Sequence, residues 1–185
     1  AVTDSATCPR PLAEQIERLA KLTELRPQAV ILRAKALDKA AYRTLALQAQ
    51  QSCEAAGIPL ILHSDWQLAR ELGISMLHLP LAFLRQISEY ERAYFTWLST
   101  SVHSVGEAQE AQALGATVLI AGHIYTTQCK AGLAPRGLGF LQSVCSAVSL
   151  PVYAIGGIGF DAAQHAELKA NGARGACVMS AYMRL

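Results

Sequence analysis

The chain contains the stretch TVLIAGHIYTTQCKAGLAPRGLG, residues 117–139, in which an apolar run leads directly into a polar, glycine-rich segment. A short apolar run of this kind is typical of a strand buried on both faces of a parallel sheet. The loop that follows carries an imidazole, a phenol, a thiol and an ammonium group, at His123, Tyr125, Cys129 and Lys130. Because catalytic groups concentrate on loops held by a rigid scaffold, we expect this loop to carry a functional site.

The same alternation of short apolar runs and helical periods recurs along the whole chain. The sequence predicts strands at 29–33, 60–62, 75–78, 97–102, 117–120, 152–155 and 176–179, with residues 1–4 as the end of a first strand. It predicts helices at 12–22, 38–56, 68–73, 89–93, 107–114, 140–147 and 161–171.

Eight strands that alternate with helices predict an α/β protein with the (β/α)8 TIM barrel fold. We expect a single TIM-barrel domain over residues 1–185, with the last helix missing or very short. A doubly wound open sheet is the alternative architecture. It is less favoured because no Gly-x-Gly-x-x-Gly motif follows the first strand.

The composition indicates a compact cytoplasmic protein. Hydrophobic residues make up 52% of the 185 residues, which favours a large core, and the net charge of +2 favours neither nucleic acid nor a membrane as partner. No apolar run is long enough to span a bilayer, and the first residues lack a signal-peptide pattern. Five scattered cysteines, an odd number, fit a reducing compartment. We expect a homo-dimer or a higher homo-oligomer.

Polar side chains gather at the predicted carboxyl ends of the strands, where barrel enzymes build their active sites. Four of the five histidines fall there, together with several cations and hydroxyls. The residues at these ends are Arg33, Lys35, His63, His78, Ser101, His103, His123 and Lys130. Each histidine taken alone is also compatible with a structural role, and Lys35 with a solvated position.

Two glycines and a serine at the last strand ends indicate phosphate binding. Gly156 and Gly157 follow one strand, and Met179 and Ser180 end the next. Glycines let backbone N–H groups approach phosphate oxygens, and the loops after the seventh and eighth strands of barrels commonly bind phosphate. The alternative is that the Gly-Gly pair is only a turn.

The sequence predicts neither a metal nor a cofactor. A zinc site needs three or four ligands on one centre, and nothing in the spacing of the histidines demands this. Asp65 is the only carboxylate near a central strand end, whereas Mg²⁺ prefers several oxygen ligands.

The chain resembles the thiamin phosphate synthase superfamily and, within it, the TenI branch of thiazole tautomerases, which belong to thiamin biosynthesis. The resemblance is carried by seven segments, Val2–Asp4, Leu32–Lys35, Leu77–Leu79, Ser101–Ser104, Gly122–Gly137, Ala154–Ile158 and Val178–Ser180.

The assignment to the branch rests on departures from the synthase pattern. Synthases carry Asn-Asp after the third strand and Gly-Gln-x-Asp after the fourth, and these aspartates bind the Mg²⁺ that holds a pyrophosphate leaving group. The matching positions here are His63-Ser64 and Pro80–Phe83. After the sixth strand, Gly122-His-Ile-Tyr-Thr-Thr-Gln-Cys-Lys130 resembles the tautomerase signature.

The resemblance implies a metal-independent isomerase, a thiazole tautomerase that aromatises a carboxythiazole phosphate by a 1,3-proton shift. His123 would act as general base and then as acid. The implied substrate-binding residues are Arg33, Lys35, Ser101, Lys130, Gly156, Gly157, Met179 and Ser180. Three alternatives stay open. They are a thiamin phosphate synthase, a non-catalytic regulatory protein that binds thiazole phosphate, and a class I aldolase that uses Lys130.

Overall fold

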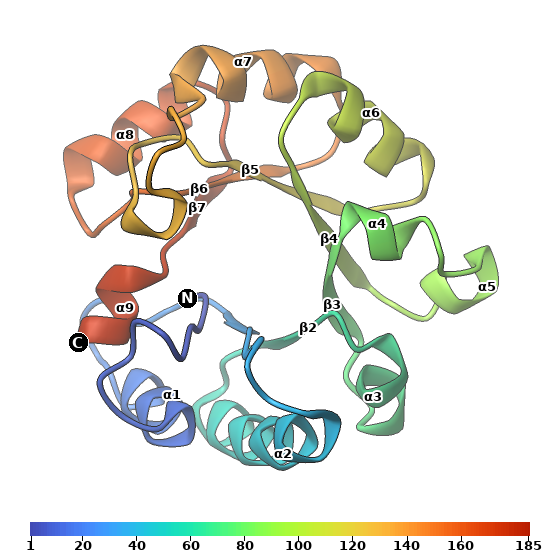
Figure 1. Ribbon diagram of the computed structural model, residues 1–185, viewed down its shortest axis with the longest axis vertical. Helices are drawn as coiled ribbons and strands as arrows, with labels where there is room; N and C mark the ends of the chain where they lie inside the picture. Colours follow the sequence, from blue (N-terminus) through green and yellow to red (C-terminus); the bar gives the residue numbers. More distant parts are fainter. The chain divides into compact units, whose positions relative to one another are not determined.

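The computed structural model describes residues 1–185, which divide into two compact units. The first unit comprises Ala1–Leu77 and Met179–Leu185, and the second comprises His78–Val178. Seven strands are hydrogen-bonded in the order of the sequence, from β1 to β7, and every described pairing is parallel. Figure 1 shows how the helices alternate with these strands along the chain.

The first unit contains α1 (Leu12–Ala20), β1 (Val30–Leu32), α2 (Lys39–Ala56), β2 (Leu60–His63), α3 (Trp66–Glu71) and α9 (Ser180–Arg184). β1 and β2 are buried and pair in register, with Leu32 opposite Leu62. α1 buries Leu12, Ile16 and Leu19, which recur at helical spacing, and the helix packs against α2.

The ends of α2 follow directly from its sequence. The Asp38 side chain accepts a hydrogen bond from the Ala41 N–H at 2.8 Å, which satisfies one of the unpaired donors of the first turn. Gly57 ends the helix with φ of 64°, a conformation that glycine adopts without a Cβ clash.

The second unit contains α4 (Leu81–Leu84), α5 (Glu89–Arg92), β4 (Trp97–Val102), α6 (Val105–Ala113), β5 (Val118–Gly122), the 3₁₀ turn η1 (Gln128–Lys130), α7 (Gly137–Ala147), β6 (Val152–Ile155), α8 (Ala162–Ala170) and β7 (Gly175–Cys177). β3 (Met76–Pro80) crosses the division between the units. β5 is buried along its whole length between β4 and β6, as its apolar sequence predicts.

The expected first strand is reduced to a single bridge, so the strands number seven and not eight. Val2 bridges Ile31 in parallel, and the Thr3 N–H donates to the Ile31 carbonyl at 3.0 Å. The chain then turns at Asp4, whose carbonyl accepts from the N–H groups of Thr7 and Cys8. This turn ends the pairing before a strand can form. The final helix is present as the five-residue α9.

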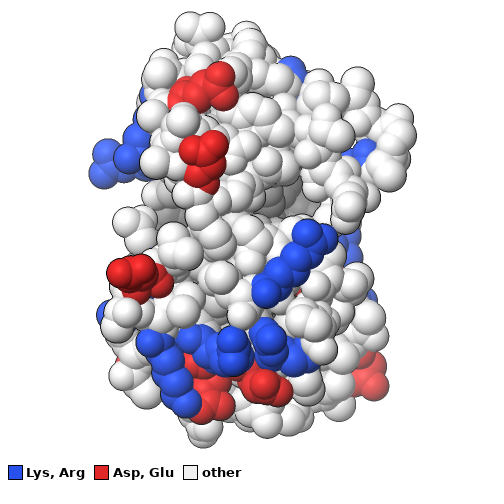
Figure 2. Space-filling model, turned by 90° about the vertical axis from the view of Figure 1, so that its left-hand side faces the viewer, with Lys and Arg blue, Asp and Glu red and all other residues white.

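The face in Figure 2 carries side chains of both charges, and the helices lack the character of membrane spans. On the face in Figure 2, Lys and Arg side chains lie mostly beside Asp and Glu side chains toward the lower end, and large areas carry no charge. None of the helices combines the length and the apolar character needed to cross a bilayer. The single-domain organisation and the oligomeric state stay predictions.

Candidate functional site

In the first unit, a cation is fixed at the carboxyl end of β1. Because Leu32 lies opposite Leu62, the next residues, Arg33 just after β1 and His63 at the end of β2, emerge at the same edge. The Arg33 N–H donates to Thr3 Oγ1 at 2.8 Å, and the Thr3 hydroxyl donates to the Arg33 carbonyl at 2.9 Å. The Arg33 guanidinium forms an ion pair with Asp4, and the two side chains are 25% and 14% exposed. Asp4 thus orients the Arg33 side chain, which the strand pattern alone did not predict.

His63 is a neutral imidazole among cations. Burial, and then the charges of Arg33 and Lys35, lower the pKa of His63 to about 4. Its Nδ1 lies 2.6 Å from Ser64 Oγ. At neutral pH this side chain therefore supplies hydrogen bonds and no charge, and the positive charge of this edge comes from Arg33 and the exposed Lys35.

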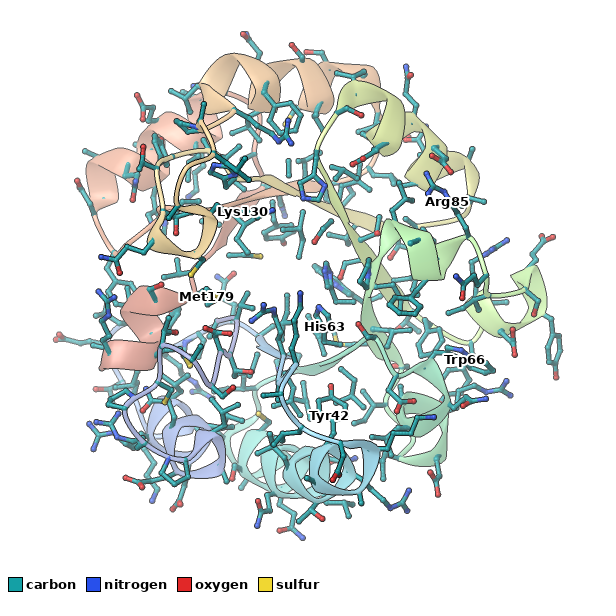
Figure 3. The ribbon with its side chains drawn as sticks, viewed as in Figure 1. Tyr42, His63, Trp66, Arg85, Lys130 and Met179 are labelled. Atoms are coloured by element: carbon teal, nitrogen blue, oxygen red, sulfur yellow. The ribbon has the colours of Figure 1, made fainter.

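Tyr42 holds the ends of β1 and β2 together. Its hydroxyl donates to the Leu32 carbonyl at 2.8 Å and accepts from the His63 N–H at 3.1 Å. In Figure 3, Tyr42 lies between α2 and the strands, and His63 lies at the end of β2. This contact fixes the backbone that carries both Arg33 and His63.

The depressed pKa of His63 predicts a loss of stability in mild acid. Between pH 6.5 and about 4 the imidazole binds a proton in the unfolded chain but not in the folded chain, so protons favour unfolding. The free energy of unfolding should therefore fall as the pH falls through this window. Urea titrations at several pH values should show a shallower fall for His63→Asn than for the wild type. Identical pH dependence for the two proteins would contradict this assignment.

In the second unit, the loop after β5 folds back over the strand end and covers His123. The His123 side chain is only 6% exposed, and its Nε2 lies 3.4 Å from the Leu133 carbonyl. The Arg136 N–H donates to the His123 carbonyl at 3.0 Å, and Arg136 Nε donates to the Gly122 carbonyl at 3.1 Å. The predicted general base is therefore enclosed by its own loop.

Lys130 lies on the same loop but faces solvent. It ends η1, where Cys129 is also exposed, and Figure 3 places it on the segment that follows β5. His123 and Lys130 were predicted to act in one site, but the loop buries the His123 imidazole and exposes the Lys130 ammonium group.

The Gly156-Gly157 turn packs directly against this loop. Gly156 has φ of 104°, and a Cβ added there would lie 2.7 Å from His123 Cα. Gly157 has φ of 70°, and an added Cβ would lie 2.5 Å from the Thr126 carbonyl oxygen. Gln164 on α8 fixes the turn, since its side chain donates to the Gly157 carbonyl at 3.0 Å. Both glycines therefore have a packing function, whether or not phosphate binds there.

Ser101 and the Met179-Ser180 pair are half-buried. Ser101 occupies the next-to-last position of β4, opposite Ile120 of β5. Met179 immediately precedes α9, and Ser180 begins it. Figure 3 shows Met179 beside this short helix.

The structure corrects the position of His78. The apolar pattern predicted this residue at a strand end, but β3 continues to Pro80 and the His78 side chain is only 5% exposed. Its two ring nitrogens each contact a serine hydroxyl of β4, Ser99 or Ser101, at 3.0 Å. The i, i+2 spacing of these serines, which places both on one face of the strand, was the signal that could have revealed the contact.

These elements define the class of the protein: an α/β protein with sequentially ordered parallel strands, which carries cationic and hydrogen-bonding side chains near the carboxyl ends of its strands. Residues 1–182 match the sequence model of a family described as thiamine monophosphate synthase. The chain belongs to this family.

Similar proteins of known sequence carry the name thiamine-phosphate synthase. One from Listeria monocytogenes is 36% identical over 147 residues, which cover 77% of this chain and 67% of the relative. One from Desulfitobacterium hafniense is 33% identical over 158 residues, which cover 82% of this chain and 73% of the relative.

A solved structure confirms the predicted fold class. Thiamine phosphate pyrophosphorylase from Pyrococcus furiosus superposes with a TM-score of 0.78, over all of this chain and 86% of that one. The two sequences are 22% identical, so this likeness concerns the fold alone.

These findings overturn the prediction of a metal-independent thiazole tautomerase. The relatives are named as synthases, which are transferases and not isomerases. The prediction was wrong because it gave most weight to the positions His63-Ser64 and Pro80–Phe83, where the synthase pattern has metal-binding aspartates. The residues after β1 give a physical reason against that weighting, since Arg33 and Lys35 place positive charge there even without a metal ion.

The magnesium ion implied by the family does not fit the residues of this chain. At the first matching position, His63 and Ser64 contact each other, and Asp65 caps α3 by accepting from the Leu68 N–H at 2.9 Å. At the second, Pro80–Phe83 offers no side-chain oxygen. No group of three or more His, Cys, Asp and Glu side chains within residues 1–185 could hold a metal ion. The donor set therefore lacks the oxygen ligands that Mg²⁺ requires.

Proposed function

We propose that the chain is a transferase of the thiamine-phosphate synthase type, which joins a pyrimidine pyrophosphate to a thiazole phosphate. The observation that carries this proposal is the 33–36% identity to named synthases over about three quarters of the chain or more. The family match over residues 1–182 supports it.

The proposed reaction is a substitution at the carbon that bears the pyrophosphate. The carbon–oxygen bond breaks, and its electron pair leaves with pyrophosphate. The thiazole nitrogen supplies the pair for the new carbon–nitrogen bond, so charge and atoms balance without an oxidant or a reductant. The enzyme must bind two anionic substrates and stabilise the charge that develops on the leaving group.

In this proposal, the first unit binds the pyrophosphate. Arg33 is the main ligand because its guanidinium can make two hydrogen bonds to phosphate oxygens. Lys35 adds a second positive charge. The neutral imidazole of His63, together with Ser64, contributes hydrogen bonds at the same edge of the sheet. The protein's own cations thus serve where the family's carboxylates would hold a metal ion.

The proposed contacts to the thiazole phosphate are those predicted from the sequence. Within the second unit they are the backbone at Gly156 and Gly157 and the exposed Lys130. The substitution removes no proton from the thiazole, so it requires no general base. We assign His123 the task of holding the loop after β5 through its contact with the Leu133 carbonyl.

The test is the formation of thiamin phosphate from the two substrates, measured by mass spectrometry with added Mg²⁺ and with EDTA. We expect product only when both substrates are present, and we expect it to persist in EDTA. Absence of coupled product under both conditions, from a protein that is folded by circular dichroism, would contradict the transferase assignment. If product forms only with Mg²⁺, the transferase assignment stands, but the proposal that pyrophosphate binds without a metal ion is wrong.

A further inference from the structure

The Asp4 carboxylate joins two segments of the first unit that lie far apart in the sequence. Its Oδ1 accepts from Arg33 Nη1, and its Oδ2 accepts from the Thr7 hydroxyl at 3.2 Å. The Asp4 side chain is only 14% exposed and the Arg33 side chain 25% exposed, so solvent screens this ion pair less than a pair on the open surface. Both carboxylate oxygens therefore have a side-chain partner within the same unit.

The backbone on both sides of Asp4 is also fixed. The Asp4 carbonyl accepts from the Thr7 N–H at 3.3 Å and from the Cys8 N–H at 3.1 Å, which closes a turn. Thr3, which precedes Asp4, is fully buried, and its hydroxyl bonds to both the N–H and the carbonyl of Arg33. The carboxylate thus reaches the guanidinium from a backbone that is already held against the end of β1.

This arrangement orders the Arg33 side chain before any ligand arrives. A long cationic side chain that a ligand must first immobilise lowers the affinity by about 3- to 10-fold. A guanidinium has five N–H donors, and the contact with Asp4 engages it through Nη1, so donors are left for a second anion. Arg33 can therefore keep its ion pair and bind a phosphate group at the same time.

We propose that Asp4 is a positioning residue, which holds the Arg33 guanidinium in the orientation that binds the pyrophosphate group of the substrate. Asp4 does not touch the ligand, and its negative charge by itself repels an anion. Its loss therefore has two consequences of opposite sign, which the experiment must separate. The choice of ligand rests on the proposed transferase function, whereas the ordering of Arg33 by Asp4 does not.

The first test measures the mobility of the Arg33 side chain by ¹H–¹⁵N NMR relaxation of the arginine Nε groups. The spectrum of Arg33→Lys identifies the signal. We expect Arg33 Nε to be nearly as rigid as the backbone in the wild type and clearly more mobile in Asp4→Ala. Arg43, which is 45% exposed, is the reference for an ion-paired arginine on the surface. Arg33 Nε as mobile as Arg43 Nε in the wild type would overturn the proposal.

The second test measures the binding of inorganic pyrophosphate by calorimetry in EDTA. Asp4→Asn and Asp4→Ala remove the same charge, but only asparagine keeps an acceptor oxygen for Arg33. The difference between the two variants therefore reports the positioning of Arg33 and not the loss of repulsion. We expect Asp4→Ala to bind about 3- to 10-fold more weakly than Asp4→Asn. Equal affinities of the two variants, both folded by circular dichroism, or no binding by the wild type would overturn the proposal.

Glu17→Ala is the matched control for the loss of a paired carboxylate in the first unit. Glu17 pairs with Lys21 at 2.6 Å, and these side chains are 56% and 72% exposed. This variant should bind pyrophosphate as the wild type does, because the pair lies on the exposed face of α1. A loss in Glu17→Ala as large as that in Asp4→Ala would show an effect of net charge alone and would overturn the proposal.

None of these readouts depends on turnover, so the two proposals fail separately. A rigid Arg33 and the expected order of affinities without formation of thiamin phosphate would remove the transferase function and keep the role of Asp4. Formation of thiamin phosphate together with equal affinities of Asp4→Asn and Asp4→Ala would remove only the role of Asp4.

Discussion

The Arg33→Ala variant is expected to lose on the order of 100-fold in kcat/KM for the pyrimidine pyrophosphate, because a charged hydrogen bond to an anion contributes about 1.5–3 kcal/mol. The change also leaves the Asp4 carboxylate, which is 14% exposed, without its ion-pair partner. An unpaired carboxylate at this edge would repel an anionic ligand. Steady-state kinetics with the pyrimidine substrate varied measures the loss.

Arg43→Ala is the matched control in the same unit. Arg43 pairs with Glu71 at 2.5 Å, and these side chains are 45% and 57% exposed. An exposed pair of this kind contributes little to stability and lies on the outer surface of α2 and α3. We expect kcat/KM to stay within about twofold of the wild type. If Arg33→Ala also stayed within that range, Arg33 would not bind the substrate.

The second large effect is expected from Gly156→Ala, which should lower the free energy of unfolding by about 3 kcal/mol. The added Cβ would lie 2.7 Å from His123 Cα and 3.2 Å from the Ile124 nitrogen, and φ at this position is 104°. The obstacle is backbone, which cannot move aside as the end of a flexible side chain could. The loop after β5 would have to shift away from the turn.

Gly159→Ala is the control for this substitution. An added Cβ there meets nothing within 4 Å, and no positive φ disfavours alanine. Urea unfolding curves of both variants and the wild type measure the difference. Equal stability of the two variants would show that Gly156 is not held against the loop.

Local sequence signals predicted most of the helices and strands because their causes are local. Asp38 and Gly57 bound α2 as an N-cap and a left-handed C-cap, and each needs only its own backbone neighbours. The strands around Leu62 and Leu119 are apolar because both of their faces are buried, and that pattern is visible in single-letter code.

The errors arose where tertiary contacts decide the structure. The apolar run from Leu77 to Phe83 is compatible with strand or helix, and the chain divides it at Pro80 between β3 and α4. This extension moves His78 from the strand end into the core. The burial of His123 depends on the hydrogen bonds that Arg136 makes to the strand end, which no local pattern encodes.

The placement of two candidate residues followed from the strand pattern, whereas the functional roles of the candidate residues stay predictions. Parallel pairing of β1 and β2 brings Arg33 and His63 to one edge, as the strand pattern implied. The ion pair of Arg33 with Asp4 joins residues 29 positions apart and was not predicted. The reaction was predicted wrongly because loss of a metal-binding carboxylate was taken as loss of the substitution chemistry.

The most direct test of the transferase assignment is a single-turnover experiment in EDTA, with excess protein and both substrates, in which pyrophosphate and thiamin phosphate are counted in the same quenched samples. We predict that the two products appear together and in equal amounts, and that both form on the order of 100-fold more slowly in Arg33→Ala. Release of pyrophosphate without thiamin phosphate, or of neither product with or without Mg²⁺, would contradict the account.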